Sequence, residues 1–315
     1  GDMFGYWQFY PTGEDPWGKV TVWGIAEVLV SHAEGIAVGE RVYGFFPMAS
    51  HVVMRPGERS ERGFTDAMPH RSELPGLYNY YARTQSEPAQ LQALEDQRCI
   101  FFPLFMTGYV IADLLLDNDW FGVEQILIGS ASSKTGFSTA AFIRAAGFQG
   151  AIAGLTSDQN VAFSEALGCY DRVVSYSEVG SVANEPSAYI DIAGDVEVRS
   201  RLHHSLQNNA AHTLLVGATH WDQFGQSVDG EPLPGSEPQV FFAPAQIEKR
   251  DGEWGRGVMM GKAYAASIEL VTQLAPTLLM ESYTGAEACD AIWQSLLRNQ
   301  VSGQRGVMVS LQAGT

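Results

Sequence analysis

The feature that most constrains the fold of this chain is a regular alternation of short apolar runs and helical segments, which begins near residue 121. Six runs have the length and composition of buried strands, and segments with helical periodicity separate them over most of this region. Strands that alternate with helices at this spacing form right-handed βαβ units, and these build a doubly wound parallel sheet. We expect the strands at 125–128, 151–155, 172–176, 188–192, 213–217 and 239–242.

The part of the chain before this alternation has the texture of an all-β unit. Residues 1–58 are rich in Gly, Pro and aromatic residues, with strand-like runs at 27–30 and 41–45. Residues 56–97 are polar and irregular, which indicates a long loop with a short helix. Further helices are expected at 137–146, 158–167, 199–206, 264–274 and 286–297, and a closing strand at 307–311.

The composition of the chain excludes some classes of function. The chain has 36 Asp plus Glu against 19 Lys plus Arg, a net charge of −17, and such an acidic protein repels nucleic-acid phosphates. No apolar run reaches the roughly 18 residues that a membrane helix needs, and no basic segment precedes an apolar stretch at the start. We therefore expect a soluble, cytoplasmic protein without a nucleic-acid or membrane partner.

The cysteines and histidines do not form a metal-binding pattern. Cys99, Cys169 and Cys289 lie far apart, and an odd, unpaired set suits a reducing compartment. The pair His203 and His204 lies on an amphipathic segment, where a solvated helix face is a simpler explanation than a metal site. No structural zinc site is expected.

The segment after the first expected strand is the strongest candidate for a binding site. Residues 126–137, ILIGSASSKTGF, follow a strand and open a helix, which is the context of a dinucleotide-binding loop. Small residues let the backbone approach a pyrophosphate, and the N–H groups of the first helical turn point at it. Lys134 adds a cation, whereas Ala131 and Ser132 stand where glycines are usual. An ordinary serine-rich strand–helix turn remains an alternative.

Two glycines frame this loop. Gly129 suits its tight turn, and Gly136 suits a close contact between helix and sheet.

The end of the second strand bears on the choice of cofactor. An NAD site usually carries an acidic residue there, about 20 residues beyond the loop, to bind the ribose 2′-hydroxyl. Here the strand ends in the neutral residues Leu155, Thr156 and Ser157, which leave room for a phosphate. Asp158 is expected to cap the following helix. The sequence therefore favours NADP(H) over NAD(H).

These motifs together resemble the medium-chain dehydrogenase/reductase superfamily, in its zinc-free quinone-oxidoreductase-like branch. Residues 38–42, VGERV, are similar to a turn of that superfamily's GroES-like domain, and residues 105–109 to the segment that enters its cofactor domain. The SASSKT loop, together with Trp23-Gly24, is similar to an uncharacterised, mostly bacterial branch. The resemblance implies a discontinuous GroES-like substrate domain, residues 1–104 with 273–315, and a Rossmann dinucleotide-binding domain, residues 105–272. The superfamily usually has several tens of residues more before Trp23, so either N-terminal residues are missing from the sequence or this domain is abbreviated.

The resemblance also implies site residues. Those facing the pyrophosphate lie in the loop, which contributes Gly129, Ala131, Ser132, Ser133, Lys134, Thr135 and Gly136. Those around the 2′-phosphate and the adenosine ribose are Thr156, Ser157, Asn160 and Tyr176, and those lining the nicotinamide half are Thr107, Val216, Gly217, Ala218, Phe242 and Ala243. Pro103 stands where zinc-dependent relatives place a cysteine ligand, and their Gly-His-Glu motif is absent, so no metal is expected.

Without zinc, a reductase needs donors that hold or protonate a developing enolate or alkoxide. The side chains we assign to this role are Tyr43 and Thr107, although a Tyr43 packed in the core is the simpler alternative. Two functions remain open. One is an NADPH-dependent oxidoreductase that reduces a quinone or an α,β-unsaturated carbonyl, which is a small hydrophobic substrate. The other is a non-catalytic NADP(H)-binding or redox-sensing protein of the same fold.

Two aromatic or apolar runs remain to be explained. Phe4, Tyr6, Trp7, Phe9 and Tyr10 form a wall for a flat substrate or, alternatively, seal a strand edge. The run 239–243, QVFFA, lies at an expected sheet edge, and an exposed apolar edge invites pairing with a second copy. A homodimer is therefore predicted.

Overall fold

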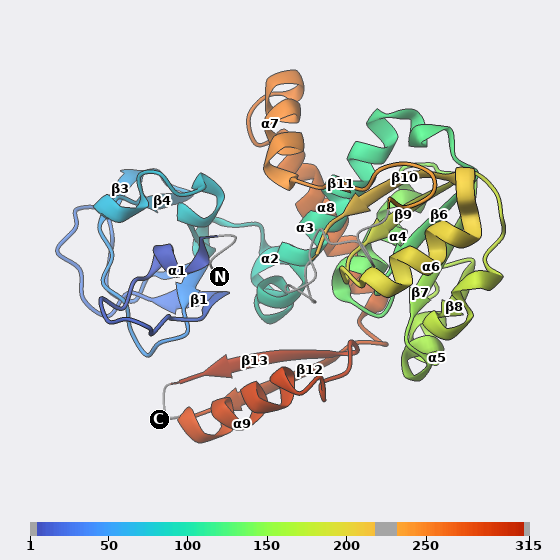
Figure 1. Ribbon diagram of the computed structural model, residues 1–315. Helices are drawn as coiled ribbons and strands as arrows, with labels where there is room; N and C mark the ends of the chain where they lie inside the picture. Colours follow the sequence, from blue (N-terminus) through green and yellow to red (C-terminus); the bar gives the residue numbers. More distant parts are fainter. Residues whose placement is uncertain (1–4, 218–231, 312–315) are drawn as a thin grey trace. The chain divides into compact units, whose positions relative to one another are not determined.

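The computed structural model describes residues 5–217 and 232–311, and these fold into two units (Figure 1). The first unit comprises Gly1–Pro103 and Met280–Thr315, and the second comprises Leu104–Leu279. The first border lies one residue before the expected one, whereas the second lies seven residues beyond it, because the helix expected to end near residue 274 is followed by a strand that starts at Leu279.

The second unit is built on a six-stranded sheet in which every strand pair is parallel. Its order is β11-β10-β9-β6-β7-β8. Sequential strands diverge from β6 in both directions, so the order changes direction between β6 and β9, and ligands of doubly wound folds bind at such a point. The central strands are buried along their whole length, which explains their continuous apolar runs. The strands are β6 Gln125–Gly129, β7 Ala151–Thr156, β8 Arg172–Ser175, β9 Ser187–Asp191, β10 Ala210–Leu215 and β11 Gln239–Val240.

Helices cover this sheet and complete the second unit. Helix α6 contributes Val198 and Leu202 to a buried cluster with Leu127 and Tyr189 of the sheet. The expected edge strand at 239–242 is shortened to the two residues of β11, and the sequence did not predict α3 or α7. The helices are α3 Glu95–Asp117, which belongs to this unit from Leu104 onward, α4 Lys134–Ala145, α5 Val161–Ala166, α6 Val196–Leu206, α7 Ala243–Trp254 and α8 Val258–Leu274.

Helix α3 corrects the expectation about apolar runs. Among the described residues it is one helix, 23 residues long with a hydropathy of 2.0, that is long and apolar enough to cross a membrane by length and composition. Scattered polar residues such as Thr107 interrupt the apolar run without lowering its mean hydropathy much. Of the apolar window, 61% is buried inside the protein, which favours the core helix of a soluble protein.

The first unit contains a five-stranded antiparallel sheet of order β1-β2-β5-β4-β3. This antiparallel sheet and the parallel sheet of the second unit confirm the expected fold class. Two other elements of this unit are the short helices α1 Tyr6–Phe9 and α2 Ala89–Gln92. The strands are β1 Thr21–Glu27, β2 Arg41–Pro47, β3 Pro56–Arg59, β4 Gly63–Asp66 and β5 Tyr80–Arg83.

Two predictions for the first unit were wrong. The strand expected at 27–30 ends at Glu27, after which Leu29 and Val30 are exposed in the connection that returns through Gly39 to β2. The segment expected to be a long loop holds β3, β4 and β5, whose four residues each are too short to show an alternating pattern. The closing strand expected at 307–311 is present as β13 Arg305–Ser310, and it pairs with β12 Leu279–Thr284 in a separate two-stranded sheet, with α9 Ala286–Leu297 between them in sequence.

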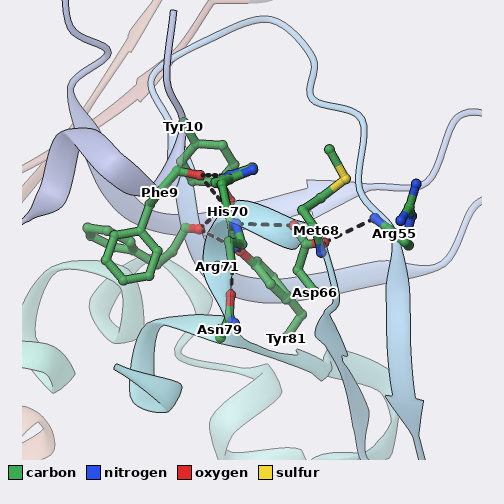
Figure 2. Close-up of polar contacts among 10 residues, drawn as sticks. Phe9, Tyr10, Arg55, Asp66, Met68, His70, Arg71, Asn79 and Tyr81 are labelled. Carbon is green, nitrogen blue, oxygen red and sulfur yellow. Dashed lines mark hydrogen bonds and ion pairs between the residues drawn. The ribbon is translucent and has the colours of Figure 1, made fainter. Parts of the chain in front are cut away.

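A buried arginine organises the core of the first unit (Figure 2). The Arg71 guanidinium donates to the Phe9 carbonyl oxygen at 3.0 Å and to the Tyr81 hydroxyl at 2.8 Å, and it lies 4.2 Å from the centre of the Tyr10 ring. Its Nε faces a carboxylate oxygen of Asp66 at 3.3 Å. This network fixes the N-terminal segment against the sheet.

The network bears on whether the aromatic residues between positions 4 and 10 form a wall for a substrate. Phe9 is 0% exposed and Tyr10 is 7% exposed, so these two rings pack inside the unit and do not wall a substrate. Tyr6 and Trp7 remain partly exposed, and Phe4 lies outside the described residues.

Candidate functional site

The connection between β6 and α4 has the geometry of a tight, close-packed loop. Ser130 adopts a left-handed backbone with φ of 54°, whereas Gly129 does not. A Cβ at Gly129 would lie 2.8 Å from the Tyr189 hydroxyl, so this glycine permits close packing and does not supply the turn. A Cβ at Gly136 would lie 2.5 Å from the Ser130 carbonyl oxygen. The expected role of Gly129 in the turn was therefore wrong, and Gly136 lets the helix approach its own loop.

Helix α4 starts at Lys134, and Ser133 is its N-cap residue. The Ser133 hydroxyl caps the helix by accepting from the Gly136 N–H at 3.0 Å, and the Ser133 N–H donates to the Ser130 carbonyl at 2.8 Å. The first turn of a helix carries a partial positive charge and binds anions. This N-terminus follows the strand next to the point where the strand order changes direction, which is where a phosphate group binds in doubly wound folds.

Two tyrosines that flank β8 hold the loop. The Tyr176 hydroxyl, just beyond β8, accepts the Ser130 N–H at 2.8 Å. The Tyr170 hydroxyl donates to the Ala131 carbonyl at 2.9 Å. Gly154 makes room for this arrangement, because a Cβ there would lie 2.8 Å from Ala131 Cβ and 3.0 Å from the Tyr170 ring. Sequence reasoning placed Tyr176 near the cofactor but missed Tyr170, since a tyrosine in a turn carries no periodic signal.

Lys134 is the first residue of α4 and is partly buried. Burial lowers the pKa of its ammonium group to about 8. An anion bound beside this ammonium group would favour its charged form and raise its pKa again.

The carboxyl ends of β7 and β8 carry a cluster of hydroxyl groups around one carboxylate. Asp158 accepts hydrogen bonds from Ser175 and, at 3.0 Å, from Ser177, and these bonds hold its pKa below the usual value. Asp158 therefore does not cap the following helix as expected. Asn160 donates to the Ser157 hydroxyl at 3.0 Å. A charged group thus lies at a sheet edge that the sequence indicated to be neutral.

Thr156 belongs to the same edge but faces inward. It is 1% exposed, and its hydroxyl donates to the Ser132 hydroxyl at 3.3 Å. It ties the end of β7 to the loop.

At the carboxyl end of β9, Asp191 forms a buried ion pair with Arg199 of α6. An Asp191 carboxylate oxygen lies 2.6 Å from Arg199, and the other oxygen accepts the Gly194 N–H at 2.8 Å. The Asp191 carbonyl accepts the Val216 N–H at 2.9 Å. Burial raises the pKa of Asp191, and Arg199 opposes that shift. Sequence reasoning missed this pair because its partners are joined only by the tertiary fold.

Val216 and Gly217 lie beside this ion pair. A Cβ at Gly217 would lie 1.9 Å from the Ile192 carbonyl oxygen, so only glycine fits there. Ala218, expected to follow them in the site, lies outside the described residues. Phe242 is 65% exposed and, with Ala243, lies at the start of α7.

The two side chains assigned to catalysis belong to different units. Thr107 lies on α3, beside Gly108, which packs closely on Ser138 and Thr139 of α4. Tyr43 lies on β2 of the first unit and is 4% exposed.

The surroundings of Tyr43 match a core residue. Its ring stacks on Trp23 with centroids 5.5 Å apart, and the Arg98 guanidinium lies 3.7 Å from its centre. This environment favours the core-packing alternative for Tyr43.

The described residues contain no group of three or more His, Cys, Asp or Glu side chains that could hold a metal ion. Cys99 and Cys289 are buried, and burial raises the pKa of the Cys99 thiol to about 12. The absence of a functional metal remains a prediction.

Comparison with known proteins supplies the family and the fold. Residues 1–302 match the family described as "Protein of unknown function (DUF2855)". The chain belongs to this family. No curated protein matches its sequence.

Solved structures match the DUF2855 chain in fold. One is a putative NADPH:quinone reductase from Mesorhizobium loti, 13% identical, with a TM-score of 0.55 over 91% of this chain and 76% of that one. Another is the yhfP protein of Bacillus subtilis with NAD bound, 16% identical, with a TM-score of 0.52 over 91% and 80% of the two chains. The expected resemblance to medium-chain dehydrogenase/reductases is thereby confirmed for the fold.

Proposed function

We propose that this protein is an NADP(H)-dependent oxidoreductase that works without zinc. The observation that carries the proposal is the loop between β6 and α4: a close-packed turn with a left-handed Ser130 that delivers the N-terminus of α4 to the point where the strand order changes direction. A helix N-terminus at that place binds a dinucleotide pyrophosphate. A bound nicotinamide would supply a hydride, and the protein would bind and orient it.

The residues present fit a phosphate-bearing cofactor. The close approach of Gly136 to the Ser130 carbonyl leaves the first turn of α4 free of bulk, and Lys134 adds a positive charge to the same turn. Lys134 and the neutral side chain of Ser157 support NADP(H), whereas Thr156, expected beside the 2′-phosphate, is buried and ties β7 to the loop. The Asp158 carboxylate opposes it, because its charge would repel a 2′-phosphate.

A fluorescence titration with NADPH and NADH tests this proposal. Tighter binding of NADPH supports it, and Asp158→Asn should strengthen NADPH binding further while leaving the fold unchanged. Tighter binding of NADH by the wild type would contradict the preference. Failure of both nucleotides to bind would contradict a dinucleotide function altogether.

For the substrate, we propose a quinone or an α,β-unsaturated carbonyl compound. One structural neighbour is named a putative NADPH:quinone reductase, and the chain shares its fold over most of its length. Oxidation of NADPH at 340 nm, followed in the presence of quinones and enones, is the direct assay. Turnover of either class supports the proposal.

The second candidate is a non-catalytic NADP(H)-binding or redox-sensing protein. The burial of Tyr43 between Trp23 and Arg98 favours it, because this removes one of the two expected proton donors from a reacting carbon. Nucleotide binding without turnover of any quinone or enone would support this alternative.

We also propose that the protein is a cytoplasmic homodimer joined along β11. Among the described strands β11 pairs with β10 alone, and Val240 and Phe242 are 64% and 65% exposed. An unpaired apolar edge of this kind favours pairing with a second copy.

A further inference from the structure

A buried carboxylate at the carboxyl edge of the parallel sheet is hydrogen-bonded on both of its oxygens. Asp191 is the last residue of β9 and is 0% exposed. One of its oxygens accepts from the Arg199 guanidinium at 2.6 Å, and the other accepts the Gly194 N–H at 2.8 Å. The Tyr189 hydroxyl also donates to this carboxylate. Donors from β9, from the following turn and from α6 therefore hold the carboxylate in one position.

The geometry of the buried ion pair explains its presence better than its contribution to stability does. Arg199 is 2% exposed, so both charges are removed from water, and the cost of their desolvation offsets much of their attraction. Apolar residues of similar volume often stabilise a fold as well as a buried ion pair does. A charged hydrogen bond between a carboxylate and a guanidinium, however, requires a short distance and a defined orientation. The pair with Arg199 thus fixes how the Asp191 carboxylate faces the turn that follows β9.

That turn connects the carboxylate with the end of β10. The Asp191 carbonyl accepts the Val216 N–H at 2.9 Å. The Ile192 carbonyl oxygen lies so close to Gly217 that a Cβ there would come within 1.9 Å of it. Because the Gly194 N–H is bound to the carboxylate, the turn over residues 192–194 cannot relax while Asp191 stays in place. The position of Gly217 therefore depends on the Asp191 side chain.

The end of β10 lies on the nicotinamide side of the proposed dinucleotide site. The strand order is β11-β10-β9-β6-β7-β8, and the pyrophosphate is proposed to bind at the start of α4, directly after β6. In doubly wound folds the adenosine half extends over the end of the strand that follows the loop, which is β7 here. The other half must then extend over the ends of β9 and β10, where Val216 and Gly217 follow the strand.

We propose that Asp191 is a positioning residue for the nicotinamide half of the dinucleotide. It holds the turn over residues 192–194, and through the Ile192 carbonyl it fixes the place of Gly217, while Arg199 balances its charge. This inference rests on the proposed function, because a dinucleotide must bind at the loop for its nicotinamide half to reach Gly217.

Two double variants test this role without leaving a buried charge unpaired. Asp191→Ala with Arg199→Met removes the ion pair and the acceptor for the Gly194 N–H, whereas Asp191→Asn with Arg199→Met removes the ion pair but keeps an acceptor. We expect the alanine variant to bind NADPH about fivefold more weakly than the wild type, and the asparagine variant to stay within about twofold of it. Adenosine 2′,5′-bisphosphate, which lacks the nicotinamide half, should bind equally to all three proteins. Isothermal titration calorimetry measures both ligands.

A second readout needs no nucleotide. Gly217 is distant in sequence from the changed side chains, so its backbone amide reports whether the turn has moved. In the ¹H–¹⁵N spectrum of the nucleotide-free protein, the Gly217 resonance should shift in the alanine variant and should shift much less in the asparagine variant.

Three results would overturn the role of Asp191 alone. Equal losses of affinity for NADPH and adenosine 2′,5′-bisphosphate in the alanine variant would show a general loss of structure. Wild-type affinity for NADPH in that variant would show that the nucleotide does not need the carboxylate. A Gly217 resonance that stays in place would show that the turn does not depend on Asp191. A wild-type protein that binds neither ligand would overturn the proposed function and this role together, whereas in the three results above the wild type still binds NADPH.

Discussion

The change from Tyr176 to Phe is the sharpest test of the loop, because it removes one hydroxyl and little else. That hydroxyl accepts the N–H of Ser130 at 2.8 Å, and Ser130 holds a left-handed φ of 54°. A left-handed backbone costs a serine about 1–2 kcal/mol, and an unpaired, partly buried N–H costs about 1–3 kcal/mol. Without the hydroxyl, Ser130 is expected to relax toward negative φ and to move its carbonyl away from Gly136.

A nucleotide that needs the original loop must then restore it on binding. If about 1–1.5 kcal/mol of the lost stabilisation is recovered at that step, NADPH should bind about 5–10-fold more weakly to Tyr176→Phe. Quenching of intrinsic fluorescence measures the affinity. Burial raises the pKa of Tyr176 to about 12, so the ratio of the two affinities should stay constant between pH 6 and 7, where Lys134 also keeps its charge.

Two further variants distinguish an effect on the conformation of Ser130 from a general loss of structure. Tyr283→Phe removes a hydroxyl that donates to Glu281 at 2.8 Å in the first unit, and it should leave NADPH affinity unchanged. Adding Ser130→Gly to Tyr176→Phe should restore affinity, since glycine adopts positive φ without strain. Wild-type affinity in Tyr176→Phe, or no rescue by Ser130→Gly, would refute the reasoning.

Five other outcomes are expected. Arg71→Met should lower the free energy of unfolding by about 3–5 kcal/mol in urea titrations, because it leaves the buried Asp66 carboxylate without its ion-pair partner; no loss would contradict the network. NADPH affinity should fall as pH rises through about 8, and Lys134→Ala should abolish this dependence and weaken binding by about 1–3 kcal/mol. The stability of the nucleotide-free protein should rise between pH 8 and 10.5, since there the unfolded lysine still binds a proton that the folded one has lost. Phe242→Lys should convert a dimer to a monomer in light scattering, and a wild-type monomer at micromolar concentration would refute the edge pairing. Dialysed protein should contain no stoichiometric zinc and should keep its activity in a chelator.

The parallel sheet could be predicted from the sequence because its strands are buried on both faces. Such strands appear as continuous apolar runs, and β6 and β7 begin where the pattern predicts. The four-residue strands β3 to β5 could not be found in this way, because four residues are too few to show an alternating pattern. Helix α3 was missed although it is long, since Pro103 inside it is a signal for a break.

The candidate site was predictable where its residues are contiguous. Residues 129–136 form one loop, so their proximity follows from the chain itself. The contacts of Asp158 with Ser175 and of Asp191 with Arg199 join separate elements, and they appear only when the strand order is known. The sequence therefore indicated which loop is the candidate for anion binding but not which residues support that loop.

The contacts that hold residues 129–136 in place argue against the alternative that this loop is an ordinary strand–helix turn. An ordinary turn has no need of a serine at φ of 54°, since glycine or asparagine would adopt that conformation with less strain. Here the serine is kept there by a hydroxyl from beyond β8, and its carbonyl meets a glycine that no side chain could replace without a shift. Strain that the surroundings maintain at a strand end is typical of a binding position. Such a loop is fixed before its ligand arrives, which is why we expect Tyr176→Phe to change the affinity for NADPH more than it changes the stability of the fold.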